Sequence, residues 1–501
     1  MGLVALLAAC TPRGPSWPTD DSLVIAFESA PMHLDPRIAT DQSSGRIHQL
    51  ILNGLVTKNP QGGLDPDLAS SWEISEDGLR YRFELRQDVR FHDGRPLTSA
   101  DVVWTYGTII DGSVPTAKRA AFSLIESVEA VDEHTVDFLL SRPHGALLAD
   151  LTAPQGVIPN GISTEEMNRH PIGTGPFRFV ERSPDQVVLE SNPDYRDGAP
   201  AITRLILREV PDSTVRVLEL QKGSVQLVVN GLTPDQVPAF RNNPRFRVAE
   251  SPGANYAYLG VNLTDPILSD RRVRRAIALA LDRQVLVESL WRGLARVTET
   301  MMPAGHWARN DDLEPMTRDL ATAANLLDQA GYTDPEGPEP RFRLTFKSST
   351  NEDSLLQAQI IQAMLAEVGI ELELRSYEFA TFYGDIKQGN FQLFSLVWTG
   401  ITDPHIYNLV LHSRSVPPDG SNRGRYHNPE FDRLIDDGSR FTDPARRRPF
   451  YLEAQRILAE DLPYISLYHK VTVAVMPVTL EGYQNYLSGE LLSLKEVHWR
   501  H

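Results

Sequence analysis

The alternation of apolar and polar residues predicts several strands in the first half of the chain. Leu23–Phe27 is a short apolar run typical of a buried strand. Apolar and charged residues alternate through Arg80–Arg86, which predicts a strand with one buried face. Thr98 or Ser99 is expected to cap the helix that follows. The first half is therefore built differently from the second.

A change of pattern joins the two halves. Tyr256–Val261 predicts a strand, which must end by Asp265-Pro266 because proline has no N–H for a strand ladder. Apolar residues then recur at helical spacing between Asp270 and Leu281, and Asp282 is expected to cap a second helix. We expect the arginines at 271, 272, 274 and 275 on the solvent face of the first helix.

Helices and strands alternate in most of the second half. The pattern predicts helices at 318–330, 354–368 and 379–388 and strands at 342–346, 370–374 and 391–398. Strands separated by helices of this length favour right-handed crossovers and a mostly parallel sheet. Trp398–Pro404 directly follows a strand, at the sheet edge where ligand sites form.

The charge and the cysteine count argue against nucleic-acid binding and against disulfide or thiolate-zinc chemistry. Lysine and arginine total 49 against 66 acidic residues, a net charge of −17, so a nucleic-acid partner is not expected. Cys10 is the single cysteine, which excludes an intramolecular disulfide and a thiolate zinc cluster.

Several passages resemble one protein family. They are ASSWEISEDGLRYRFELRQDVRFHDGRPLTSADVVWTY at 69–106, PIGTGPFRF at 171–179, YLGVNLTDPILSDRRVRRAIALALDR at 258–283, and Asn422, Tyr426, Asn428 and Phe431 within 420–435. Together they resemble the large extracytoplasmic solute-binding proteins of bacterial ABC importers, in the family of the dipeptide-, oligopeptide- and nickel-binding proteins. The resemblance extends over about residues 23–497.

The resemblance implies an α/β fold of the periplasmic-binding-protein type, class II, with mixed or parallel sheets. Two lobes would form a cleft and a small extra lobe would be attached. Lobe I would comprise 23–48, 173–257 and 473–501, lobe II 49–172, and lobe III 258–472, with residues 1–22 as a signal remnant and tether. Hinge bending near 257–262 and 471–475 would close the lobes over the ligand.

The resemblance also implies the ligand contacts. These are backbone groups of the loop after the first strand and of the loop after Trp398, with two tyrosine rings packing on the ligand: Ser29, Ala30, Met32, Trp398, Thr399, Gly400, Tyr256 and Tyr426. In peptide-binding relatives an aspartate three residues after this tryptophan pairs with the peptide amine, but Ile401 stands there. Asp403 is the remaining candidate, although Asp-Pro turns more often use the carboxylate to hold their own backbone. We therefore expect weak discrimination between free and acetylated peptide N-termini.

The first 22 residues predict a membrane anchor. Leu7–Cys10 resembles a bacterial lipobox, in which the cysteine is diacylated, and 11–21 is a tether rich in Pro, Gly, Ser and Thr. The usual basic segment before a lipobox is missing, so the true start is expected upstream. The protein is expected as a lipid-anchored monomer of the cell envelope, working with an ABC permease and ATPase. A ligand sensor without a permease is an alternative.

Catalytic and metal motifs are absent from the sequence. There is no Gly-x-Ser-x-Gly, Ser-x-x-Lys, Gly-x-x-x-x-Gly-Lys or His-Glu-x-x-His, and His92-Asp93 is interpreted as a turn. A two-carboxylate glycoside hydrolase is the enzyme alternative. Surface histidines are favoured over a metal site, and no cofactor is expected; the histidines considered are His405, His412, His498 and His501. Binding of nickel chelates, haem or another non-peptide solute is the alternative to peptide binding.

Overall fold

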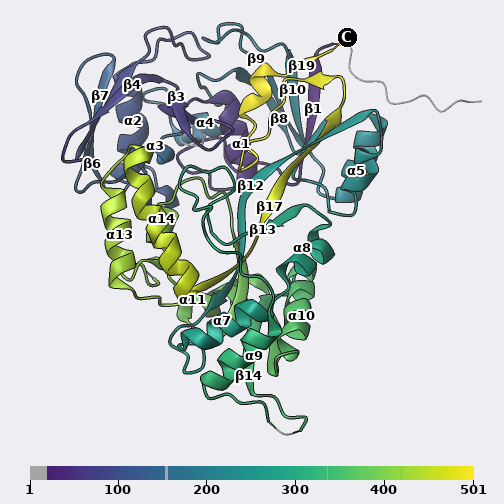
Figure 1. Ribbon diagram of the computed structural model, residues 1–501. Helices are drawn as coiled ribbons and strands as arrows, with labels where there is room; N and C mark the ends of the chain where they lie inside the picture. Colours follow the sequence, from purple (N-terminus) through teal and green to yellow (C-terminus); the bar gives the residue numbers. More distant parts are fainter. Residues whose placement is uncertain (1–19, 153–155, 336, 419, 501) are drawn as a thin grey trace, which may run out of the picture.

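The fold is organised around one long mixed sheet and a smaller antiparallel sheet (Figure 1). The computed structural model describes residues 20–152, 156–335, 337–418 and 420–500. Cys10 and the expected tether up to residue 19 lie outside the described residues. Within these ranges no helix has the length and apolar character needed to cross a bilayer.

Eleven strands form the long sheet, in the order β15-β14-β16-β12-β17-β11-β1-β10-β9-β8, with β13 pairing to β17. The strands are β1 (Ser22–Phe27), β8 (Phe177–Ser183), β9 (Gln186–Ser191), β10 (Arg204–Glu209), β11 (Leu227–Val229), β12 (Phe246–Val261), β13 (Ala295–Val297), β14 (Phe342–Ser349), β15 (Ile370–Tyr377), β16 (Leu393–Trp398) and β17 (Tyr464–Pro477). β14 pairs in parallel with β15 and β16, as expected, and β1 pairs in parallel with β10 and β11.

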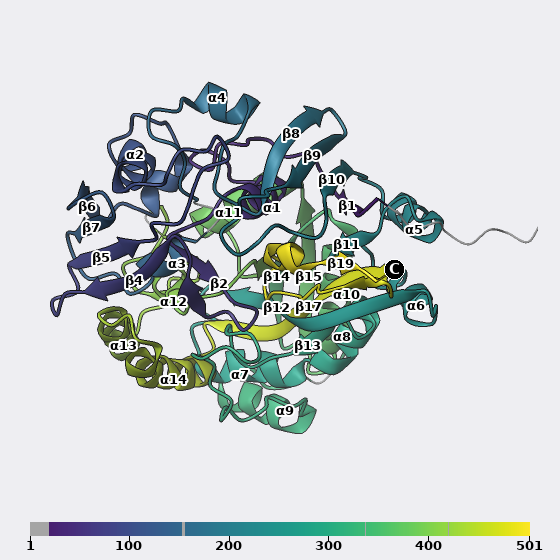
Figure 2. The same ribbon diagram turned by 90° about the horizontal axis from the view of Figure 1, so that it is seen from above.

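Two long antiparallel strands connect the halves of this sheet. β12 and β17 pair from Phe246 and Pro477 at one end to Gly260 and Tyr464 at the other, and they run side by side through the middle of both views (Figures 1 and 2). Their register shifts between Pro252 and Tyr256. Both halves of the sheet therefore share one strand pair with an irregular segment at its centre.

The N-terminal part comprises the β1 side of the long sheet with helices α1 (Gln42–Ile51), α5 (Ser213–Lys222) and α6 (Val237–Arg241). α1 covers one face, where its Ile47 and Leu50 join the core formed by Leu23 and Ile25 of β1. Leu220 of α5 belongs to the core on the other face. The C-terminal strands β18 (Leu480–Glu481) and β19 (His498–Trp499) and the short helix η3 (Leu492–Glu496) also lie against this part.

The small-sheet part contains the sheet β4-β5-β7-β6. Its core includes Phe83, Tyr106 and Phe138, whose rings meet edge to face with centroids 5.3–5.5 Å apart. The elements are β2 (Val56–Lys58), β3 (Leu64–Pro66), β4 (Ala69–Ile74), β5 (Arg80–Leu85), β6 (Ile125–Ala130), β7 (Thr135–Leu140), α2 (Ser99–Ile110), η1 (Ala117–Ala120), α3 (Leu147–Asp150) and α4 (Thr164–Arg169). The predicted one-sided strand is confirmed as β5, and Thr98 is the N-cap of α2.

The turn at His92-Asp93 is structural, as interpreted from the sequence. His92 accepts a hydrogen bond from Gly173 N and its Nε2 lies 3.1 Å from Gly175 O. A Cβ on Gly173 would lie 1.9 Å from Ile51 O, so only glycine fits this crossing. The glycines of PIGTGPF therefore allow a close backbone contact.

The C-terminal part packs helices against β12–β17 and contains two hydrophobic cores. Its helices are α7 (Arg271–Ala280), α8 (Arg283–Trp291), α9 (Leu320–Gln329), α10 (Glu352–Ala366), α11 (Phe379–Gln388), α12 (Ile406–Leu411), α13 (Pro429–Ser439) and α14 (Pro444–Asp461). Asp270 and Asp282 cap α7 and α8, as predicted.

One of the four arginines of α7 is not on a solvent face. Arg271, Arg272 and Arg275 are exposed, but Arg274 is buried and donates to the carbonyls of Leu268, Ser269 and Asp461. The expectation for Arg274 was wrong because the end of α14 lies against α7, so the guanidinium satisfies carbonyl groups that would otherwise lack partners.

A buried histidine in α1 predicts that acid destabilises the protein. Burial, and after it the charge of Lys118, lowers the pKa of His48 to about 3. The unfolded chain therefore binds a proton between about pH 6.5 and pH 3 that the native state excludes, so stability rises with pH in this window and is complete above it. His48→Gln should flatten the dependence of the unfolding free energy on pH by up to about 1.4 kcal/mol per pH unit near pH 5.

Urea unfolding at several pH values measures this effect. The exposed residue His427 provides the control, because His427→Gln should leave the pH dependence as in the wild type. Parallel pH profiles for His48→Gln and the wild type would contradict the prediction.

Candidate functional site

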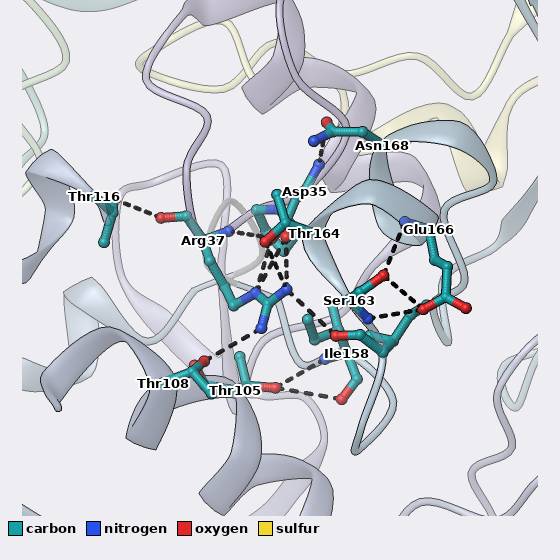
Figure 3. Close-up of polar contacts among 12 residues, drawn as sticks. Asp35, Arg37, Thr105, Thr108, Thr116, Ile158, Ser163, Thr164, Glu166 and Asn168 are labelled. Atoms are coloured by element: carbon teal, nitrogen blue, oxygen red, sulfur yellow. Dashed lines mark hydrogen bonds and ion pairs between the residues drawn. The ribbon is translucent and has the colours of Figure 1, made fainter. Parts of the chain in front are cut away.

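A buried ion pair holds the loop that follows β1. Arg37 binds Asp35 with contacts from 2.7 to 3.2 Å, and both side chains are almost fully buried. Arg37 also donates to Thr108 of α2 and Thr164 of α4, while Asn168 accepts from the backbone of Leu34 and Asp35 (Figure 3). The loop is thus fixed against the small-sheet part.

The predicted ligand contacts in this loop lie before the ion pair. Ser29 is exposed and its Oγ lies 3.1 Å from Ser43 Oγ, Ala30 is half-buried, and Met32 leaves 68% of its surface exposed. An apolar side chain exposed to this degree beside a fixed loop is available to a ligand. The three positions remain proposals as ligand contacts.

The second predicted segment follows β16. Trp398 is half-buried and stacks on Tyr258 with centroids 6.4 Å apart, while Thr399 is exposed. Gly400 donates from its backbone N to Asn255 Oδ1 at 3.0 Å and has φ +66°, a left-handed conformation that favours glycine. Ile401 is buried, with 3% of its surface exposed.

Asp403 is engaged by an arginine. Both carboxylate oxygens accept from Arg447 of α14, at 2.8 and 2.9 Å, and Oδ1 also accepts from His405 N at 2.7 Å. Burial raises the pKa of this carboxyl, but the charge and hydrogen bonds of Arg447 outweigh burial and hold the pKa below its ordinary value. The carboxylate therefore holds its own turn and Arg447, and it is not free for a ligand amine.

The two predicted tyrosines belong to the hydrophobic core. Tyr256 and Tyr426 expose 2% and 4% of their surfaces. The hydroxyl of Tyr256 lies 2.7 Å from Ser466 Oγ, and the hydroxyl of Tyr426 donates to Asp461 at 2.6 Å. We therefore leave both rings out of the proposed ligand contacts.

A cavity of about 330 Å³ lies between the small-sheet part and the C-terminal part. One wall carries Lys58 and Trp72, and the other carries Trp307, Asp403 and Arg447. Lys58 is already paired with Glu490 at 3.0 Å. The cavity wall thus contains two indole rings, and its charged groups Lys58, Asp403 and Arg447 are held in ion pairs. Such a lining suits a small polar solute.

The three parts of the chain meet around this cavity. The His144 ring of the small-sheet part lies edge to face against His405, with centroids 4.9 Å apart, and Gly145 N donates to Ser439 O. A Cβ on Gly400 would lie 3.8 Å from Ser488 Oγ of the C-terminal loop. The C-terminal part therefore contacts both the small-sheet part and the C-terminal loop.

The histidines considered as metal ligands have separate neighbours. His405 faces His144, whereas the nitrogens of His412 lie 3.5 and 3.4 Å from Asp432 and Asp436. His498 lies 3.7 Å from Glu481, and His501 is outside the described residues. Among the described residues no group of three or more His, Cys, Asp or Glu side chains is placed to hold a metal ion.

Sequence reasoning missed Arg46 and Arg423. Arg423 lies between Asn422 and Tyr426 of the family-like passage, and it is buried, with 4% of its surface exposed. Asn422 itself is structural, because its amide donates to the carbonyls of His412 and Tyr426. The signal available in the sequence was the charge of Arg423, which stands in a passage whose Tyr426 and Phe431 are apolar residues typical of a core.

Comparison with known sequences identifies the family. The profile described as "Bacterial extracellular solute-binding proteins, family 5 Middle" matches residues 63–417. The chain belongs to this family. The passages at 69–106 and 171–179 that resemble this family have structural roles here. They form the turn at His92-Asp93 and the close backbone contact at Gly173.

Similar proteins extend over nearly the whole chain. Di/tripeptide-binding protein 2 of Pseudomonas aeruginosa is 30% identical over 92% of this chain and 92% of its own length. Heme-binding protein A of Haemophilus influenzae is 28% identical, covering 93% of this chain and 90% of its own. The solved structure of HbpA2 from Haemophilus parasuis is 27% identical and superposes with a TM-score of 0.87 over 96% of this chain and 100% of that one. These similarities confirm the expected periplasmic-binding-protein fold.

The ion pair of Asp403 predicts a stability effect. Arg447→Met would leave the Asp403 carboxylate buried without a cation, which costs about 3–5 kcal/mol in comparable buried pairs. Chemical unfolding should show this loss in the free energy of unfolding.

The neighbouring exposed Arg446 supplies the control. Arg446→Met should change stability by less than about 0.5 kcal/mol. Equal stability of the Arg447→Met variant and the wild type would show that the pair is not buried in solution.

Proposed function

We propose that the protein captures a small polar solute or peptide in the space between its parts and delivers it to the permease of an ABC importer. The observation that carries this proposal is the position of two loops from distant parts of the sequence. The loop after β16 meets the C-terminal loop where a Cβ on Gly400 would lie 3.8 Å from Ser488 Oγ, and a cavity with aromatic and charged walls includes Thr402 and Asp403 of the same loop. Family membership and the peptide-binding relative support the same reading.

The proposed mechanism is hinge closure about β12 and β17. The lobes would follow the expected boundaries, with 23–48, 173–257 and 473–501 in lobe I, 49–172 in lobe II and 258–472 in lobe III. One register shift, between Pro252 and Tyr256, faces His469–Val471, and a second, between Ala257 and Tyr258, lies at the start of the segment expected from sequence as the hinge. Irregular pairing supplies the local freedom that a hinge needs, while the paired strands on each side keep both lobes rigid.

Capture of solutes from a bacterial extract tests this function. Native mass spectrometry should detect a bound small molecule, and small-angle scattering should show a more compact protein with solute than without it. Trp398 fluorescence should change on binding because its ring lies at the proposed site. A protein that binds no peptide or extract component, with no change in size, would contradict the proposal.

A lipid anchor at Cys10 is part of the proposal. The lipobox-like run before this residue supports it. A clone with an upstream start should place the protein in the membrane fraction, and Cys10→Ala should release it to the soluble fraction. If both proteins fractionate as soluble, the anchor is wrong.

Other readings of the family remain as outcomes of the capture experiment. A relative is named as a heme-binding protein, so a haem or metal chelate among captured solutes would favour the non-peptide alternative. Presence or absence of neighbouring permease and ATPase genes separates an importer from a sensor. The relatives are named as binding proteins and not as enzymes, which supports a role without catalysis.

A further inference from the structure

Arg423 is a buried guanidinium without an acidic partner. It exposes 4% of its surface and forms no ion pair with any described carboxylate. Its guanidinium donates hydrogen bonds to two phenol oxygens, Tyr258 at 3.1 Å and Tyr383 at 2.8 Å. Burial raises the pKa of Tyr258 well above its ordinary value, so this phenol is neutral and leaves the arginine charge unbalanced.

The position of Arg423 connects it to the proposed site. Its guanidinium carbon lies 4.6 Å from the centre of the Trp398 ring and 5.0 Å from that of Tyr383. Trp398 begins the loop that reaches Ser488 through Gly400. The cation therefore lies beside the aromatic residue expected at the ligand, in contact that favours its charged form.

A second such arginine lies beside the C-terminal loop, next to Gly489. Arg46 of α1 is buried, has one hydrogen bond to Val229 O at 3.4 Å, and leaves its Nε without a partner. A Cβ on Gly489, the residue after Ser488, would lie 3.7 Å from its Nη2. Arg46 thus lies next to the C-terminal loop at Gly489, and Arg423 lies next to Trp398 at the start of the loop that meets it.

The nearby acids are occupied or distant. Glu490 accepts from Lys58 and from Ser488 N, so both of its oxygens have partners. The exposed Glu28 lies 3.9 Å from Arg216. In contrast, Arg447 and Arg37 are buried beside carboxylates. Arg274 is also buried without an ion pair, but its guanidinium donates to the carbonyls of Leu268, Ser269 and Asp461. In a chain with 17 more acidic than basic residues, the unpaired charges of Arg46 and Arg423 are not explained by composition.

We propose that Arg46 and Arg423 are specificity-determining residues that bind oxyanion groups of the solute, so that the protein selects anionic ligands. A buried guanidinium is stabilised when a planar anion accepts its parallel N–H groups, and carboxylate and phosphate both meet this geometry. The buried Ser488 Oγ, which has no partner, adds a hydrogen-bonding group at the same place. Ile401 supplies no carboxylate for a ligand amine, in agreement with an anionic preference. This inference rests on the proposed function.

Calorimetry with isosteric dipeptides tests the preference. The probes are N-acetyl-Ala-Glu, N-acetyl-Ala-Gln amide, N-acetyl-Ala-phosphoserine amide and N-acetyl-Ala-Ser amide, which lack a free amine. The wild type should bind the charged forms at least tenfold more tightly than the neutral ones, and the first and third probes separate carboxylate from phosphate recognition. Arg46→Gln and Arg423→Gln should each lower affinity for the charged probes at least tenfold and leave the neutral ones unchanged.

A control and a stability measurement separate binding from folding. Arg433→Gln alters an exposed arginine of α13 that is paired with Asp437 and should bind as the wild type does. Arg423→Gln should unfold at or above the temperature of the ligand-free wild type, because it removes a buried charge without an acidic partner. Should that variant fail to fold, the preference of the wild type among the four probes still decides the proposal.

Two outcomes would overturn the inference, and they are distinguishable. Equal affinity of the wild type for charged and neutral probes would overturn anionic selection and leave the proposed function intact. Failure to bind these probes or any component of the extract would overturn the proposed function and this inference with it.

Discussion

The antiparallel pairing of β12 with β17 is the constraint on which the rest of the structure depends. These strands hydrogen-bond to each other in both halves of the long sheet, so each half is built outward from the same pair. Their pairing loses register within Pro252–Tyr258, and in this segment Gly253 passes so close to Lys470 O that a Cβ would lie 2.2 Å from it. A single irregular segment in an otherwise continuous pair concentrates bending at one place, because the flanking ladders resist it.

This pairing also determines which loops meet. β16 lies next to β12 and ends at Trp398, while β1 is reached from β17 through β11. Loops that leave these strands therefore come from two halves of one sheet, and the loop after β16 meets the C-terminal loop at Ser488. The N-terminal loop is not free to adjust, because Arg37 and Asp35 fix it to the helices of the small-sheet part. A ligand would accordingly meet preformed walls, which reduces the ordering that binding requires.

Buried arginines fall into two groups in this protein. Arg37, Arg283 and Arg447 each contact a carboxylate, and their charges stabilise loops or helices that would otherwise expose polar groups. Arg274 lacks such a contact but donates to three carbonyls, whereas Arg46 and Arg423 have neither arrangement and lie beside the C-terminal loop and beside Trp398. The difference separates arginines that serve the fold from arginines available to a solute, since an unbalanced buried charge is unfavourable unless a ligand compensates it.

The sequence alone determined the elements and the family. Hydrophobic periodicity and capping residues predicted β1, β5, α7 and α8, because these signals act over a few residues of chain. Only the tertiary structure decided which side chains face the site. Tyr256 and Tyr426 were expected to contact the ligand, but both rings lie in the core. Asp403 forms an ion pair with Arg447, an arginine 44 positions away. Arg274 and Arg423 were misjudged or missed for the same physical reason: whether an arginine meets water, a carbonyl or a carboxylate depends on segments distant in sequence, which local periodicity does not encode.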